Sequence, residues 1–458
     1  MLDVLIVGAG PTGLTLGVDL ARRGVRALVI EAGDDVAAGS RGKGLQPRTM
    51  EVFEDLGVLD AVLAAGGRYP VSLIWKNGEP AGEHVMFDPA EEGEKDCRFM
   101  EPWMVPQERT ARILLARLGE LGGSVRFGAR AVGVEQDADG VTVRLADGEA
   151  LRARHVVAAD GGRSTVRRAL GVAMTGGGVA PGREKPGTGE VDPDPFLVAD
   201  VRIPGLDRGH WHMFPPPREG SGFLALCPLA GTEDFQLVAG FPGGGTPDLS
   251  LAGVRAVVAE RTHLAAGDVT AVSWVSAFRP RAALADRFRV GRVFLAGDAA
   301  HVHSPAGGQG LNTSVQDAYN LGWKLGAVLH GGAPPRLLDT YEEERRPVAA
   351  AMLGLSTAIH RAERTRGAAT RQLGLHYRES PLSEETRRDP GPLRAGDRFP
   401  DVTVDGVRLF DRLRGPRWTS LTLDSGVYLV RPDGYVGWAG ETPEGLDGYR
   451  RRWSVPAA

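Results

Sequence analysis

The stretch VLIVGAGPTG, residues 4–13, joins a short apolar run to a glycine-rich turn, and it decides the fold of the N-terminal part of the chain. Residues 14–23 follow with apolar side chains at helical spacing, and residues 25–30 form a second apolar run. This order predicts the strand, helix and parallel strand of a dinucleotide-binding βαβ unit. Because the chain holds 64 glycines among 458 residues, the glycine motif needs this context to carry weight.

Each glycine of the motif has its own task. Gly8 permits a tight turn, Gly10 lets the backbone approach a pyrophosphate, and Gly13 lets the helix pack closely on the strand. The helix, with Pro11 and Thr12 in its first turn, directs its N-terminus at the phosphates.

An acidic residue follows the second strand. Glu31 stands about 20 residues after the glycines, where a carboxylate accepts hydrogen bonds from a ribose hydroxyl and repels a 2′-phosphate. The pattern therefore favours FAD or NAD, rather than NADP, as the resident ligand.

Composition narrows the class of protein. The length favours two or three domains. A formal net charge of −4 gives no electrostatic case for nucleic acid. Cys97 and Cys227 lie far apart, which argues against a disulfide scaffold or a metal site. The N-terminus has no basic leader, and no apolar run reaches the roughly 20 residues of a membrane-spanning helix. We expect a cytoplasmic protein without a metal site.

Further elements extend the α/β pattern. Residues 46–56 and 106–121 have helical periodicity, with Gly57 as a stop signal for the first. Residues 141–160 predict a hairpin followed by a buried strand that ends at Asp160.

The sequence pattern changes in the middle of the chain. Residues 171–284 hold short strand-like segments separated by turns rich in proline and glycine, which predicts a sheet-rich insertion. Its entrance, residues 176–195, lacks periodicity and is predicted to be disordered. Strand and helix patterns return at residue 291, and residues 349–371 predict a long helix. The last sixty-odd residues predict a small region of short strands.

A second motif selects a flavin. In residues 291–312, GRVFLAGDAAHVHSPAGGQGLN, a buried strand delivers Asp298 to its carboxyl end, where an acid can bind a ribityl hydroxyl. The glycine-rich loop 305–310 can lie against a flat ring. Thr313 and Gln316 predict a capping box on the next helix, whose N-terminus suits the anionic end of a reduced flavin.

A third motif, DGGRSTVR at residues 160–167, places arginines beside another strand end. Arg163, Arg167 and Arg168 can form charge-assisted bonds with a pyrophosphate. Gln107 opens the predicted helix 106–121.

These ordered motifs resemble FAD-dependent aromatic hydroxylases of the p-hydroxybenzoate hydroxylase type over residues 1–360, particularly the actinobacterial subgroup that acts on aromatic polyketides and antibiotics. The resemblance implies that Gln107 and Asp298 bind the ribityl chain and that Arg41 lies near the cofactor. It also implies that Asp160 and Arg163 serve FAD and NAD(P)H. The residues expected around the isoalloxazine are Pro305, Gly308, Gly310, Leu311 and Asn312.

The C-terminal region is similar to the two ends of the thioredoxin-like domain that many relatives carry, but it lacks most of the middle. We therefore predict an α/β protein with a Rossmann-like FAD-binding domain, an inserted sheet-rich substrate domain and a reduced thioredoxin-like tail. The FAD-binding domain is expected at residues 1–75, 100–170 and 285–375, the substrate domain at 76–99 and 171–284, and the tail at 385–458.

The reaction follows from the resemblance. Only one glycine fingerprint follows a strand, so NADPH or NADH is expected to visit transiently and reduce FAD. The family then uses O2 to form a flavin C4a-hydroperoxide, which hydroxylates an electron-rich ring. The protein orients the substrate and excludes water. Baeyer–Villiger oxygenation of a polycyclic ketone or quinone, a flavoprotein that only binds an aromatic drug, and a nicotinamide dehydrogenase without flavin remain alternatives.

Substrate residues are expected where the sheet-rich domain meets the flavin domain. The candidates are Trp211, Met213, Phe223 and Phe278. Arg41 and His212 are the candidates for a catalytic side chain. The phase of the strand is open, so either Trp211 and Met213 or His212 and Phe214 face the cavity. The expected partner is one small aromatic or polycyclic substrate, bound by a monomer or homodimer.

Overall fold

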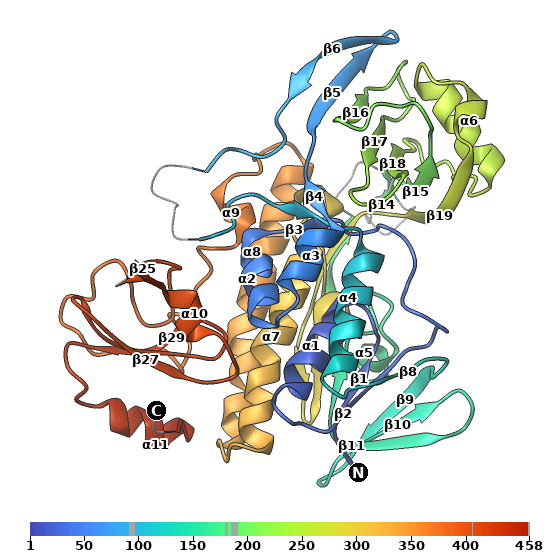
Figure 1. Cartoon of the computed structure of the whole chain (residues 1–458). Helices are drawn as coiled ribbons and strands as arrows, with labels where there is room; N and C mark the ends of the chain where they lie inside the picture. Colours follow the sequence, from blue (N-terminus) through green and yellow to red (C-terminus); the bar gives the residue numbers. More distant parts are fainter. Residues whose placement is uncertain (91–96, 179–181, 185–190, 405, 457–458) are drawn as a thin grey trace.

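The structure is a computed structural model that describes residues 1–90, 97–178, 182–184, 191–404 and 406–456 (Figure 1). A mainly parallel sheet lies between helices. Its strands run in the order β21-β22-β11-β1-β2-β8, and the β9–β10 hairpin pairs with β11. The strands are β1 (Leu2–Val7), β2 (Ala27–Ile30), β8 (Val125–Arg126), β9 (Ala131–Gln136), β10 (Val141–Leu145), β11 (Ala150–Ala158), β21 (Arg289–Val290) and β22 (Val293–Leu295).

The helices around this sheet bury its apolar strands. Val4, Leu5 and Ile6 of β1 are fully buried, as expected for a central parallel strand covered on both faces. The helices of this part are α1 (Pro11–Ala21), α2 (Pro47–Asp55), α3 (Leu59–Ala65), α4 (Gln107–Glu120), α5 (Thr165–Ala169), α7 (Gly310–Leu329), α8 (Thr340–His360) and α9 (Ala368–Arg371). Helices α1 and α7 lie so close that a Cβ on Gly322 would come within 2.2 Å of the Asp19 carboxylate.

A seven-stranded sheet forms the second layer, in the order β19-β15-β18-β17-β16-β5-β6. Figure 1 shows it beyond one end of the central sheet, with α6 (Leu251–Arg261) on its outer side. Its strands are β5 (Val71–Lys76), β6 (Glu79–His84), β15 (Phe196–Arg202), β16 (His210–Phe214), β17 (Leu224–Pro228), β18 (Asp234–Gly240) and β19 (Ala271–Phe278). Apolar side chains of α6 and of one sheet face form a separate hydrophobic core.

Short sheets connect the two layers. One joins β3 (Gly44–Leu45), β7 (Trp103–Met104) and β4 (Gly67–Arg68), and another joins β12 (Met174–Gly178), β20 (Arg281–Ala285) and β23 (His301–Val302). A third pairs β13 (Gly182–Glu184) with β14 (Val191–Pro193).

The C-terminal region carries a four-stranded sheet in the order β24-β29-β28-β27. Its elements are β24 (Glu384–Glu385), β25 (Thr403–Val404), β26 (Val407–Arg408), α10 (Leu409–Leu413), β27 (Thr419–Leu423), β28 (Gly426–Val430), β29 (Val436–Gly440) and α11 (Leu446–Trp453). It packs against α7 and α8 through buried residues that include Trp323 and Trp438.

The predicted helices 46–56 and 106–121 are confirmed as α2 and α4, and the hairpin is confirmed as β10 and β11. The predicted helix 349–371 is wrong at both ends. Pro347 lies inside the observed helix, α8, and does not interrupt it. This helix begins at Thr340 and ends at His360. Soon after this end the chain takes a left-handed conformation at Ala362, with φ of 58°.

One expected boundary falls inside a sheet. Residues 71–75, expected in the FAD-binding domain, belong to β5 of the seven-stranded sheet. Residues 174–178 form β12 and pair with β20, which lies almost wholly in the same expected substrate-domain range. Of the segment predicted to be disordered, residues 179–181 and 185–190 lie outside the described residues, whereas β12, β13 and β14 contain its described parts. In the described part of the chain, no helix has the length and apolar character needed to cross a membrane.

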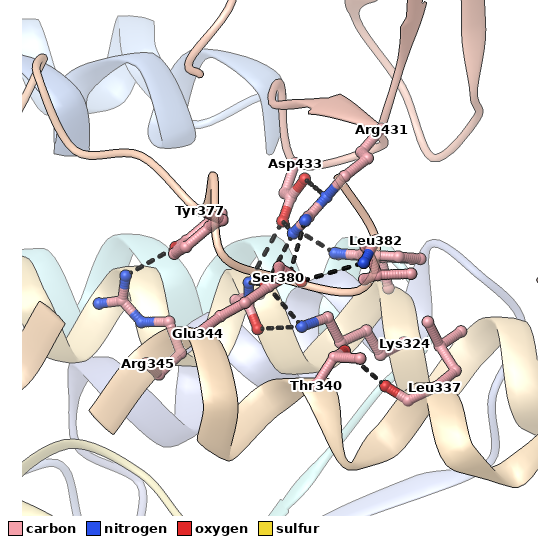
Figure 2. A network of polar contacts seen from close by, with 12 residues as sticks. Lys324, Leu337, Thr340, Glu344, Arg345, Tyr377, Ser380, Leu382, Arg431 and Asp433 are labelled. Carbon is pink, nitrogen blue, oxygen red and sulfur yellow. Dashed lines mark hydrogen bonds and ion pairs between the residues drawn. The ribbon is translucent and has the colours of Figure 1, made fainter. Parts of the chain in front are cut away.

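A buried charge network fastens the C-terminal region to the helical layer (Figure 2). The Glu344 carboxylate on α8 accepts a hydrogen bond of 2.7 Å from Lys324 Nζ on α7 and bonds of 2.7 and 2.9 Å from Arg431. Ser380 donates to the same carboxylate at 2.7 Å, and Arg431 also pairs with Asp433. The Glu344, Lys324 and Arg431 side chains are fully buried, so each charge depends on the others for compensation.

Replacing Glu344 with alanine should lower the free energy of unfolding by about 3–5 kcal/mol, because two cations would lose their shared carboxylate inside the protein. Chemical denaturation followed by tryptophan fluorescence measures this loss. Glu343→Ala is the matched control, since Glu343 is the preceding residue of α8 and is exposed. Equal effects of the two substitutions would contradict the role of the network.

Candidate active site

The three sequence motifs and Glu31 meet at one edge of the central sheet. Gly8 follows β1, Glu31 follows β2, Asp160 lies just beyond β11, and Asp298 lies just beyond β22. These strands are parallel to their neighbours, so their carboxyl ends share one edge. In open α/β sheets this edge is where ligands bind.

The glycine turn has one open position. Gly8 has φ of 109°, and a Cβ there would lie 2.3 Å from Ala159 O. A Cβ on Gly13 would lie 2.0 Å from Gly8 O, so both glycines are required by the protein itself. A Cβ on Gly10 would meet no atom within 4 Å. Gly10 therefore faces free space at the N-terminus of α1, as a site for pyrophosphate requires.

Glu31 is held against this turn. Its carboxylate accepts hydrogen bonds from the backbone N–H groups of Ala9, at 2.8 Å, and Gly33, at 3.0 Å. The acid therefore lies beside the glycines, where dinucleotide-binding folds carry the residue that accepts hydrogen bonds from a ribose.

An arginine joins the DGGRSTVR motif to the flavin motif of residues 291–312. Asp160 accepts a hydrogen bond of 2.7 Å from the Thr165 N–H at the start of α5, and its buried Oδ1 atom has no partner among the described residues. Arg163 is exposed. Buried Arg167 donates to Ala299 O and to Gly162 O, each at 3.0 Å, so Arg167 rather than Arg163 ties the two turns together.

Asp298 lies just beyond β22 and is exposed. The surrounding protein raises the pKa of its carboxyl by desolvation, partly offset by the charges of His301 and Arg41. A Cβ on the neighbouring Gly297 would come within 2.6 Å of Thr12 Oγ1. The glycine turn and the turn that carries Asp298 are therefore direct neighbours.

Asn312 connects the remaining loops. This fully buried amide accepts a hydrogen bond of 2.8 Å from Gln46 N–H and donates to Gly44 O, at 2.8 Å, and Gly308 O, at 2.7 Å. The residues expected around a flavin ring lie in the turn of Pro305–Gly307, in the link to α7 and at the start of α7. They are Pro305, Gly308, Gly310, Leu311 and Asn312.

The segment 39–46 is also held from the other side. Gln107, at the start of α4, accepts a hydrogen bond of 3.0 Å from Gly42 N–H. Leu311 lies 3.5 Å from the position of a Cβ on Gly42. Arg41 is exposed, with its guanidinium carbon 5.1 Å from the ring centroid of Trp274.

The predicted capping box at Thr313 is wrong. Helix α7 begins at Gly310, so Thr313 lies inside its first turn, and its hydroxyl donates to Gln309 O at 2.9 Å. Gln316 donates to Asn312 O. The helix starts four residues earlier than the polar pattern indicated.

The two histidines of the flavin motif form a buried chain. His303 Nε2 lies 3.0 Å from His301 Nδ1, and His301 Nε2 lies 2.6 Å from the Asp317 carboxylate. Burial lowers the pKa of His303 to about 3. Among the described residues, no group of three histidine, cysteine or acidic side chains is placed to hold a metal ion.

The register of the seven-stranded sheet settles the phase of β16. His212 and Phe214 are buried on the face that packs against α6, where Phe214 joins the hydrophobic core. Trp211 and Met213 therefore lie on the opposite face, toward the flavin motifs. His212 accepts from Trp75 Nε1 at 3.0 Å and donates from Nε2 to Asp207 O at 2.7 Å. The structure does not bring this histidine to the candidate site, and both of its nitrogens are engaged.

Phe223 and Phe278 flank a third aromatic ring. Phe196 lies between them, with ring centroids 5.7 Å from each. Phe196 and Phe223 line a cavity of about 410 Å³ together with His360. His360 Nδ1 lies 2.9 Å from Ser304 Oγ, which places this cavity next to the flavin loop.

One row of residues across the sheet seats the segment 39–43. Trp274, Asp200, Gln236, Cys227, Trp211 and Ser72 lie side by side in adjacent strands. Ser40 donates to the Asp200 carboxylate through its backbone and its hydroxyl. Gln236 donates to Ser40 O at 2.7 Å and accepts from Lys43 Nζ. Sequence reasoning missed Asp200, Gln236 and Lys43, and only the register of the strands could have revealed them.

Comparison with known proteins identifies the family. The profile described as "FAD binding domain" matches residues 1–356. The chain belongs to this family. A flavin-dependent monooxygenase of Mycobacteroides abscessus is 44% identical over 95% of this chain and 96% of its own length. A rifampicin monooxygenase of Streptomyces venezuelae is 35% identical over 97% of each chain.

A solved structure shares the architecture. An aklavinone-11 hydroxylase in complex with FAD and aklavinone matches with a TM-score of 0.82 and 28% identity, over 98% of each chain. The predicted resemblance to FAD-dependent aromatic hydroxylases is confirmed, and the protein is an FAD-dependent monooxygenase. The site fits FAD, because Gly10 leaves room for the pyrophosphate and Asp298 offers an accessible carboxyl beyond β22.

Gly10→Ala should weaken FAD binding at least tenfold without lowering the stability of the apoprotein, since the new methyl group would project only into space kept for the pyrophosphate. Fluorescence titration of the apoprotein with FAD measures the affinity. Gly119→Ala on α4 is the control, because a Cβ there also meets no atom within 4 Å. Unchanged FAD affinity in the Gly10 variant would contradict the assignment.

Asp200 should give stability a distinct pH dependence. Burial raises the pKa of its carboxyl from 3.8 to about 6, so between these values the folded protein holds a proton that the unfolded chain releases. Its contribution to the free energy of unfolding is full below the lower value and is lost, by about 2–3 kcal/mol, as the pH rises through the upper one.

Asp200→Asn removes this titration, so the variant should gain stability relative to the original protein between pH 4 and pH 7. Urea denaturation at both pH values measures the difference, and contributions of other groups cancel. A stability difference that does not change with pH would contradict the raised pKa.

Proposed function

We propose that the protein hydroxylates a polycyclic aromatic, polyketide-like compound, using FAD, O2 and NADPH or NADH. The observation that carries the proposal is the aromatic face of the seven-stranded sheet opposite the flavin loop. Phe196, Phe223 and Phe278 present flat rings beside a cavity of about 410 Å³, which is large enough for a substrate of several fused rings. The relatives that act on rifampicin or hold aklavinone support the same substrate class.

The residues of this chain position the reactants. Bound FAD supplies the oxygen-transfer chemistry. Trp211, Met213, Phe223 and Phe278 bind and orient the substrate from the sheet, and apolar walls exclude water from the reacting atoms. His212 is not proposed as a base, because it lies on the other face. Arg41 is proposed as a cofactor ligand, since its charge acts on Asp298.

The domain organisation is part of the proposal. The central sheet and its helices form a discontinuous FAD-binding domain, and the seven-stranded sheet is the inserted substrate domain. The four-stranded C-terminal sheet is proposed as the remnant of a thioredoxin-like domain.

A substrate screen tests the function. The yellow holoenzyme is mixed with NADPH and polycyclic phenols or quinones, and NADPH oxidation and product mass and structure are measured. We expect faster NADPH oxidation and a product with one added ring hydroxyl. An oxygen inserted between a ketone carbonyl carbon and its neighbouring carbon, which gives an ester or lactone, would establish Baeyer–Villiger chemistry instead. Binding without acceleration would favour a drug-binding role, and a protein that takes up no flavin would overturn the proposal.

Phe278→Ala should raise KM for an accepted aromatic substrate about tenfold and change kcat much less, because the ring contributes stacking area to ground state and transition state alike. Steady-state kinetics at fixed NADPH measures both constants. Val132→Ala, in the exposed part of the β9–β10 hairpin, is the control. A KM that stays unchanged would remove Phe278 from the substrate site.

A further inference from the structure

Lys43 lies where the flavin-side segment meets the substrate sheet. It belongs to segment 39–46, between Gly42, which bonds to Gln107, and Gly44, which bonds to Asn312. Its ammonium donates to Gln236 Oε1 and lies 4.6 Å from the ring centroid of Trp211. The residue is only partly exposed to solvent.

The charge of Lys43 is incompletely compensated. The other interior lysine described here, Lys324, has the Glu344 carboxylate at 2.7 Å (Figure 2). Among the described residues, Lys43 has no carboxylate within the ion-pair distance of 4.0 Å. The titratable groups around it are Asp200, Cys227 and Arg366, and Asp200 is already engaged by Ser40. Burial accordingly lowers the pKa of Lys43.

Unused donors lie beside this cation. Among the described residues, neither Trp211 Nε1 nor the Ser72 hydroxyl has a hydrogen-bond partner, and both atoms are buried. Ser72 is the register partner of Trp211 in β5. A cation and two unpartnered donors on one sheet face lack a shared acceptor. A negatively charged oxygen is the group that would satisfy such a set most strongly.

We propose that Lys43 is a substrate-recognition residue whose ammonium binds an ionised oxygen, a phenolate or enolate, of the aromatic substrate. The inference rests on the proposed function and names the substrate class more narrowly: polycyclic aromatics that carry an acidic ring hydroxyl. The ion pair holds that oxygen in its charged form, which enriches the ring in electrons before oxygen transfer. Trp211 contributes a flat surface beside the pair.

Equilibrium binding to the holoenzyme without NADPH tests this role. The probes are 1,2-dihydroxyanthraquinone and its dimethyl ether, which share a ring system and differ in the ionisable hydroxyls. We expect the dihydroxy compound to bind at least tenfold more tightly and to show the red-shifted absorption of its ionised form when bound. Lys43→Met should abolish both the preference and the shift, and Lys43→Arg should keep them.

Two further variants separate recognition from a structural role. Lys76→Met, on the exposed part of β5, is the control for loss of a lysine charge and should change neither readout. Gln236→Leu removes the tether of Lys43 but keeps the ammonium, and it should retain the preference for the dihydroxy compound. FAD content reports the folding of every variant.

The outcomes distinguish the two proposals. The role of Lys43 is overturned, and the proposed function stands, if Lys43→Met retains the preference and the spectral shift. The same holds if Lys43→Met weakens the binding of both probes by the same factor. If the original protein binds both probes with equal affinity, the role is overturned as well. If it binds no polycyclic aromatic at all, both proposals fail.

Discussion

The fully buried Asn312 side chain sets the relation between the parts of this protein. Its amide bonds to backbone groups of segment 39–46 on one side and of the flavin loop on the other. Segment 39–46 contains only the two-residue strand β3, and the flavin loop at Pro305–Gly307 is a short helical turn, so sheet pairing fixes little of either segment. If either segment moved away, the Asn312 amide or its backbone partner would lose a hydrogen bond and remain as a desolvated polar group, which costs free energy. Asn312 therefore ties the two segments to each other, while Gln107, Asp200 and Gln236 hold segment 39–46 from its other sides.

Helix α7 transmits this constraint to the rest of the molecule. It begins at Gly310, beside the flavin loop, and carries Asp317 and Lys324 further along. Asp317 pairs with His301 of the flavin motif and with Arg345 of α8. Lys324 joins the network through which Arg431 anchors the C-terminal region. The C-terminal sheet is thus coupled to the same helix that presents the flavin loop, and undocking it would leave several buried charges uncompensated.

The cofactor side could be predicted from the sequence because its demands are local. A few neighbouring residues are enough to predict each of its features. These features are the positive φ at Gly8, the close approach at Gly13 and the acid after a strand. The substrate side depends on which residues of different strands lie side by side. Alternation alone could not decide whether Trp211 or His212 faces the site, since a shift of one residue reverses every side chain. Arg167 and Arg163 are likewise indistinguishable until the backbone shows which one is buried.

This difference has a consequence for specificity. Glycine turns and backbone contacts recognise a flavin whatever the substrate, so they restrict the surrounding sequence little beyond the motifs. The row of residues across the seven-stranded sheet, which includes Asp200, Gln236 and Trp211, has a different role. It holds the segment that carries Arg41 and Lys43 against that sheet. A change in that row moves a charged side chain relative to the aromatic cavity while leaving the glycine turns intact. On the proposed function, substrate preference can therefore diverge through the sheet register and position 43, with the flavin chemistry preserved.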